Sequence, residues 1–302
     1  MAGSFGDWFG TLKNTFKVGK STLSASGVAT ARTHTLPDAA GTVALTSDTY
    51  GGAVLRGHIS GLLLANNGAD ANNDIDISVG EATDSTATYL LKLTSAITKR
   101  LDAAWAAGTN QGGIDTGSEA ASTWYHVWLI RKDSDGSADV LFSTSVSSPT
   151  MPSGYTAKRL IGSVYNDASS ALQAFVCAET ANGIVVQWST PVLDINLANT
   201  LTTTAQLNTL SVPVGYKVKA FFNVGQQDTV SGNNTYISDP DTSDVAPSAS
   251  VAPLHTLYGS TSVIVAYRRE CWTNSSGQIR SRASTTIDSY KLATLGWEWG
   301  RR

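Results

Sequence analysis

The residues that could do chemistry include two loop-like motifs. Gly19-Lys20-Ser21-Thr22 resembles the end of a phosphate-binding loop. That loop needs a glycine five residues before its Gly-Lys pair, and this sequence has Asn14 at that position. Residues 70–81 place Asp70 and Glu81 at the ends of a calcium-loop pattern, but Ile75 stands where the sharp turn requires glycine. We interpret 70–81 as a surface turn, with an ion bound in another geometry as the alternative, and predict no nucleotide site.

The remaining ionisable groups do not form a catalytic pattern. Asp239, Asp241 and Asp244 lie in one loop, whereas glycosidic cleavage needs two carboxyl groups on opposite sides of a groove. We therefore interpret these aspartates as solvated or turn-forming. The histidines have no metal-binding spacing, and His126 between two tryptophans is expected to be a packed residue rather than a base. The sequence predicts no enzyme, no metal site and no cofactor.

From residue 53 onward, short aromatic and β-branched runs alternate with turn residues. The clearest hairpin joins residues 124–130 to 138–144 through Asp135-Gly136, because an Asp-Gly pair favours a tight hairpin turn. This pattern predicts an all-β body, an antiparallel β-sandwich or jelly roll. Its halves are 51–180 and 181–302, as one unit or two. Residues 95–107 are the best helical candidate, and the loop 229–250 is not expected to hold a regular ladder.

Residues 1–50 differ from the body. Trp8, Phe9 and Phe16 lie among glycine and polar residues, and a Ser/Thr/Ala-rich stretch follows with neither a helical nor a strand period. Such a segment cannot bury its own apolar groups, so we expect it to be extended and to become ordered against sister copies or a larger assembly. Gly51-Gly52 is the expected boundary with the body.

The composition indicates which classes of partner the chain could bind. Charged residues make up 15% of the 302 residues and the net charge is -3, without the clustered Lys and Arg that nucleic acid requires. No apolar run is long enough to insert into a membrane. Residues 1–20 lack a secretion-signal pattern, so we expect Cys177 and Cys271 to be reduced core thiols, with a disulfide between them as the alternative. Low charge and strands that are apolar on both faces favour an obligate oligomer, and a thick monomeric sandwich is the alternative.

The segment Ala31–Ala44, which reads ARTHTLPDAAGTVA, resembles a motif of tailed-bacteriophage fibre and tail-appendage proteins. His34 stands where that motif usually has an aromatic residue. Several body segments are also similar to phage virion proteins: 73–77, 99–105, 112–117, 125–130 and 158–163. The resemblance implies an all-β intertwined homotrimer in the virion, assembled in the host cytoplasm and attached through its N-terminus to a tail, adaptor, collar or portal-proximal protein.

The resemblance also implies roles for particular residues. Trp8, Phe9 and Phe16 are the expected particle anchors, unless they pack only among the three copies. The anchor motif would turn at Leu36-Pro37-Asp38, where Pro37 fixes the backbone, and Gly41 would let the chain enter a short strand.

The body would contribute to contact with a host-surface glycan or protein, and Tyr236 and Trp272 are the expected contact residues. The alternative is a purely structural head, collar or neck fibre, or a connector to another receptor-binding protein. A capsule-degrading enzyme would need a long β-helix, and the sequence shows no repeat at the required period.

Overall fold

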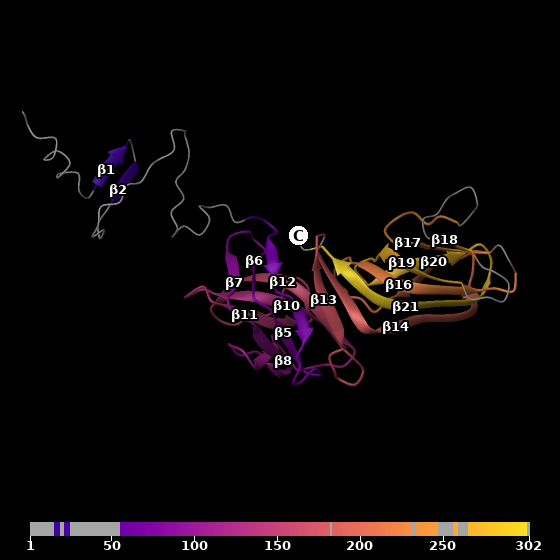
Figure 1. Ribbon diagram of the computed structural model, residues 1–302, viewed down its shortest axis with the longest axis horizontal. Coiled ribbons are helices and arrows are strands. Elements are labelled where there is room, and N and C mark those ends of the chain that lie inside the picture. Colours follow the sequence, from indigo (N-terminus) through magenta and orange to yellow (C-terminus); the bar gives the residue numbers. More distant parts are fainter. Residues whose placement is uncertain are drawn as a thin grey trace, which may run out of the picture. The chain divides into compact units, whose positions relative to one another are not determined.

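The computed structural model describes residues 15–18, 21–24, 55–181, 183–230, 233–246, 256–258 and 265–300. The chain divides into two units, Met1–Gly52 and Ala53–Arg302. All regular elements within the described residues are β-strands, which confirms the predicted all-β class (Figure 1). Within those same ranges, no helix could span a bilayer.

The described part of the first unit is a β-hairpin. β1 (Thr15–Val18) pairs antiparallel with β2 (Ser21–Ser24), and Phe16 lies opposite Leu23. β1 and β2 pair although no strand period is visible in this part of the sequence. Trp8, Phe9 and the motif residues Leu36, Pro37, Asp38 and Gly41 lie outside the described residues.

The first half of the second unit contains two sheets. The three-stranded sheet has the order β3-β6-β7, with β3 (Ile59–Gly61), β6 (Gly80–Thr83) and β7 (Leu90–Leu93). The seven-stranded sheet has the order β12-β10-β11-β9-β8-β5-β4. Its strands are β4 (Leu64–Asn66), β5 (Asp74–Ile77), β8 (Ile97–Ala104), β9 (Gln111–Ile114), β10 (Thr123–Lys132), β11 (Ala138–Ser143) and β12 (Tyr155–Asn166).

The predicted hairpin is confirmed, and the helical candidate is wrong. β10 and β11 pair antiparallel from His126↔Ser143 to Arg131↔Ala138 on either side of Asp135-Gly136. Residues 97–104 form β8 instead of a helix, and buried and more exposed positions alternate at its start. That alternation has the period of two that places one face of a strand on the core.

One strand departs from the expected antiparallel pattern. β9 pairs in parallel with both β8 and β11. The two backbones approach closely at Gly112, where a Cβ atom would lie 2.0 Å from the carbonyl oxygen of Ala104. Only glycine fits this position without a shift of the backbone. The sequence predicted antiparallel pairing because strands that follow one another in the chain usually pair that way. No local sequence feature indicates that β9 lies in parallel between β8 and β11.

The second half also contains two sheets. The five-stranded sheet has the order β13-β14-β21-β16-β19, with β13 (Phe175–Thr180), β14 (Gly183–Leu201), β16 (Lys219–Gln227), β19 (Val265–Trp272) and β21 (Ile287–Trp299). The four-stranded sheet has the order β15-β20-β17-β18, with β15 (Gln206–Thr209), β17 (Asn234–Ser238), β18 (Thr256–Tyr258) and β20 (Gln278–Ala283). β17 lies inside the predicted loop 229–250, so that prediction was wrong there. Its buried Thr235 and Ile237 alternate with less buried neighbours.

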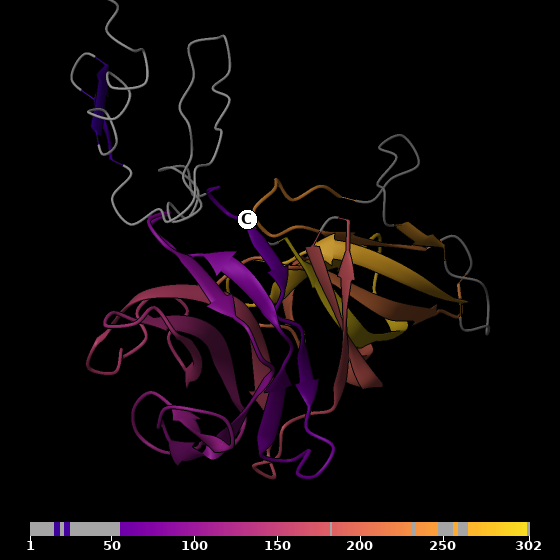
Figure 2. The same ribbon diagram turned by 60° about the vertical axis from the view of Figure 1, so that its left-hand side comes forward.

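The two halves share one hydrophobic core and lie side by side (Figure 2). Three tryptophans join them: Trp124 of β10 has its ring centroid 5.9 Å from that of Trp188 and 5.6 Å from that of Trp297. The second apolar face of β10 is covered from within the chain, since Trp128 and Ile130 form a smaller buried cluster against Trp105 and other residues. The chain itself therefore accounts for this doubly apolar strand.

Candidate functional site

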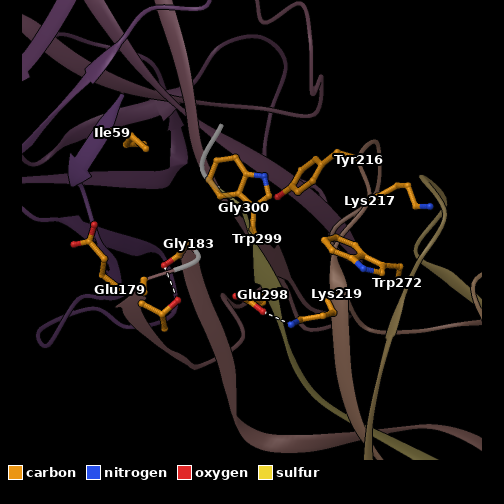
Figure 3. Close-up of a pocket in the computed structure, with 12 residues that line it drawn as sticks. Ile59, Glu179, Gly183, Tyr216, Lys217, Lys219, Trp272, Glu298, Trp299 and Gly300 are labelled. Atoms are coloured by element: carbon orange, nitrogen blue, oxygen red, sulfur yellow. Dashed lines mark hydrogen bonds and ion pairs between the residues drawn. The ribbon is translucent and has the colours of Figure 1, made fainter. Parts of the chain in front are cut away.

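Two hollows in the surface meet at Trp272, the last residue of β19. A hollow of about 820 Å³ has a wall formed by Tyr216, Trp299 and Glu298 (Figure 3). A smaller hollow of about 260 Å³ is lined by Tyr236, Asp239 and Glu270, among others. Trp272 and Lys219 line both hollows. We refer to the two hollows together as the Trp272 groove.

Strand register brings the central side chains together. Lys219 of β16 lies directly opposite Trp272 of β19 on one side and Glu298 of β21 on the other. Residues directly opposite one another in a sheet point to the same face, so these three side chains form one row across three strands. The row depends on close packing of β16 and its neighbours, which come from distant parts of the sequence.

A β-bulge aligns this row. Phe221 lies opposite Gly296 and Phe222 opposite Thr294, so Leu295 is an extra residue in β21. The bulge keeps Trp297 in the core, at 2% exposure, and leaves the adjacent Glu298 on the groove side. Gly296 has φ 154°, and a Cβ atom there would lie 2.1 Å from the carbonyl oxygen of Val186.

Ion pairs hold the charged side chains of the groove. Lys219 Nζ lies 2.6 Å from Glu298 Oε2, the contact drawn as a dashed line in Figure 3, and 3.8 Å from Glu270 Oε1. Lys217 Nζ lies 2.9 Å from Asp239 Oδ2 and 2.8 Å from Asp241 Oδ2. Hydrogen bonds to Glu298 and Asp241 raise the pKa of Lys219 and Lys217, respectively. Both lysines therefore remain charged and already have carboxylate partners.

Aromatic rings complete the groove. The Trp272 side chain is 48% exposed, the highest value for an aromatic residue in the part of the chain whose burial is described. Tyr216 and Trp299 lie together, with their ring centroids 5.7 Å apart. The Tyr216 hydroxyl forms a hydrogen bond with Ser163 Oγ, and burial raises the pKa of this tyrosine. The wall of the larger hollow is thus tied to β12 in the other half of the body.

The structure brings together the two residues predicted from the sequence as host contacts. Tyr236 and Trp272 line the same small hollow. Asp239 and Asp241 pair with Lys217, while Asp244 pairs with Arg282 Nη1 at 2.7 Å. These aspartates are therefore ion-paired, and Asp239 also accepts a hydrogen bond from the Asp241 amide, as a turn-forming residue does.

Sequence reasoning missed Lys217, Lys219, Glu298 and the ring pair Tyr216–Trp299. Lys219 and Glu298 occur in strands whose pairing is not visible in the sequence. The only local signal is a charged residue at the end of each apolar run, which is also common at ordinary strand ends.

The other chemical candidates among the described residues do not line the groove. His126 is buried, as predicted, and its Nδ1 lies 2.8 Å from Ser163 Oγ. Burial lowers the pKa of His126 from 6.5 to about 4. Asp70 accepts hydrogen bonds from Asn73 in an exposed turn before β5. The surface-turn interpretation of 70–81 holds only for these first residues, because 74–77 form β5 and Glu81 lies in β6.

The described residues contain no cluster of three or more His, Cys, Asp or Glu side chains that could hold a metal ion. Cys177 and Cys271 are not joined by a disulfide; Cys271 is buried and Cys177 is half-buried. No protein-family model matches this sequence, and comparison with curated proteins finds no similar one.

Proposed function

We propose that this chain is a tail fibre protein of a tailed-bacteriophage virion. In this proposal it forms a homotrimer with a jelly-roll-like sandwich body, its N-terminal segment attaches to the tail or collar, and the body contributes to attachment to the host surface. The observation that carries the proposal is the ARTHTLPDAAGTVA motif at 31–44, followed by a body whose described elements are all strands.

The Trp272 groove supports host contact over a purely structural role. Trp272 is half-exposed beside a hollow of about 820 Å³ and lies outside the hydrophobic core clusters. Exposed aromatic side chains in concave sites are typical of binding surfaces. A structural head, collar or neck fibre, or a connector to another receptor-binding protein, is the second candidate, and it would not need this groove.

Deletion of residues 1–20 in the phage that carries this chain tests the attachment. The truncated protein is expected to form a folded trimer, measured by sedimentation, that is missing from purified particles. The segment 53–302 is a separate unit, which is why the body should remain folded. Normal incorporation of the truncated protein would show that the anchor assignment of Trp8, Phe9 and Phe16 is wrong.

Trp272→Ala serves as the matched control in the same phage. This variant is expected to enter particles at the normal level, because Trp272 is outside the buried core. Purified Trp272→Ala protein should then bind host cells more weakly than the unchanged protein. Equal binding of both proteins to host cells would favour the purely structural fibre.

A further inference from the structure

We infer that the Trp272 groove binds a sugar ring that carries no acidic group. The inference rests on the proposed host attachment and names the class of ligand that the groove takes. The groove combines an exposed aromatic ring, fixed polar groups and an excess of carboxylates.

The exposed ring favours a ligand with a flat apolar face. The Trp272 indole is 48% exposed and lines both hollows, so a ligand in either hollow can lie against it. One face of a pyranose ring presents C–H groups, and these pack on an aromatic ring as other apolar groups do. A fully apolar ligand, such as a lipid chain, would instead exclude water from the neighbouring ion pairs without replacing the hydrogen bonds that water makes to them, at a cost.

The polar groups of the groove suit the hydroxyls around a sugar ring. Lys219 offers donors and Glu298 offers acceptors within 2.6 Å of each other, and Lys217 with Asp239 repeats this arrangement at 2.9 Å. Each hydroxyl both donates and accepts, so paired ammonium and carboxylate groups can satisfy it in two ways. The ion pairs restrict these side chains before a ligand arrives, which lowers the entropy lost on binding.

The charge of the groove disfavours acidic sugars. Four carboxylates surround the two lysines of the groove: Asp239 and Asp241 lie beside Lys217, and Glu270 and Glu298 lie beside Lys219. Both lysines already pair with carboxylates, including Asp241. A sugar carboxylate or sulfate would therefore have to displace one of these partners and would be repelled by the others. An amino group on the sugar would be attracted.

The test uses the purified full chain on an array of neutral, amino-bearing and acidic oligosaccharides, the last carrying carboxylate or sulfate groups. We expect binding to one or more neutral or amino-bearing sugars and none to the acidic set. Trp272→Ala should weaken that binding by about tenfold or more, and Trp272→Phe should retain most of it. Tyr267→Ala is the matched control, because Tyr267 is an exposed aromatic of the same strand outside both hollows.

A second set of variants tests the charge argument. Glu270 is exposed and lies 3.8 Å from Lys219, so its replacement should leave the fold intact. Glu270→Gln and Glu270→Lys both make the groove less negative. Both variants should bind acidic sugars, and Glu270→Lys should bind them more tightly than Glu270→Gln. Unchanged selectivity in both variants would overturn the charge argument.

Three results would overturn the inference: preference for acidic sugars, equal binding by Trp272→Ala, or binding to no sugar on the array. None of these bears on the fibre assignment, which the deletion of residues 1–20 tests through incorporation into particles. If the truncated protein fails to enter particles and the full chain binds no sugar, the chain is a fibre that contacts the host in another way. Sugar binding with normal incorporation of the truncated protein would leave a sugar-binding body and refute the anchor.

Discussion

At the scale of single residues, the polar groups buried in the body are held by partners that come from distant strands. Lys99 Nζ, at 0% side-chain exposure, lies 3.1 Å from Asp139 Oδ1 and donates to the carbonyl oxygens of Ala106 and Gly108. His126, Ser163 and Tyr216 form a second chain of hydrogen bonds that links the two halves. Buried polar groups of this kind are costly unless they are satisfied.

The buried His126 should make stability depend on pH. Its pKa falls from 6.5, the ordinary value that applies in the unfolded chain, to about 4 in the folded chain. Between these values the unfolded state binds a proton that the folded state does not, so stability is full above pH 6.5 and falls as the pH is lowered through this window. The loss by pH 4 should be about 3 kcal/mol.

Urea unfolding between pH 7.5 and pH 4 measures this loss. Protonation of carboxylates with a lowered pKa, such as Asp84, also destabilises the protein in acid. The comparison with His126→Gln therefore separates the contribution of the histidine from that of the carboxylates. The variant has no imidazole to titrate and should show a shallower decline over the same range. Parallel declines in the two proteins would mean that His126 is not the group responsible.

At the scale of elements, the bulge in β21 places Glu298 in the groove, opposite Lys219. Gly296 allows β14 and β21 to approach, and the extra residue Leu295 restores the register in which Glu298 faces Lys219. The strand alternation of β21 alone would not show where this shift occurs. A bulge is set by the fit of neighbouring strands rather than by local sequence preference.

Gly296→Ala should therefore destabilise the body and disturb the groove. The added Cβ would lie 2.1 Å from Val186 O, a backbone atom that cannot move without loosening β14. We expect a loss of about 2 kcal/mol or more in the free energy of unfolding. Gly68→Ala is the control, since a Cβ atom there would meet nothing within 4 Å, and it should change stability little. Similar melting temperatures for both variants would contradict this account.

The sequence predicted some elements well and others poorly, for identifiable reasons. The β10–β11 hairpin was predictable because its turn residues and its two strands are adjacent. β8 was mistaken for a helix because its residues 97–104 include good helix formers, although their burial follows the period of a strand. β17 was mistaken for part of a loop because glycine and proline residues flank a five-residue strand.

At the scale of the whole molecule, the two halves of the body depend on each other. The core is continuous across them, and Trp188 and Trp297 lie with ring centroids 5.1 Å apart beside Trp124. Neither half could lose this contact without exposing large aromatic surfaces to water.

The segment 53–302 should consequently unfold in one cooperative transition. Tryptophan fluorescence and circular dichroism are expected to give the same midpoint during denaturation. Trp188→Ala should remove part of the shared core, lower that midpoint and cost about 3–5 kcal/mol, as large-to-small changes of buried aromatics do. Two separate transitions in the unchanged protein would show that the halves are independent.

The sequence by itself determined that this chain forms strands and where its clearest hairpin turns. It also led to Tyr236 and Trp272 as expected contact residues. These depend on local preferences, since alternation and turn chemistry act over a few residues. Only the tertiary structure decided that Lys219, Trp272 and Glu298 form one row beside Tyr216 and Trp299. That row depends on the register of strands distant in the chain, which is set by the packing of the whole core and one bulge.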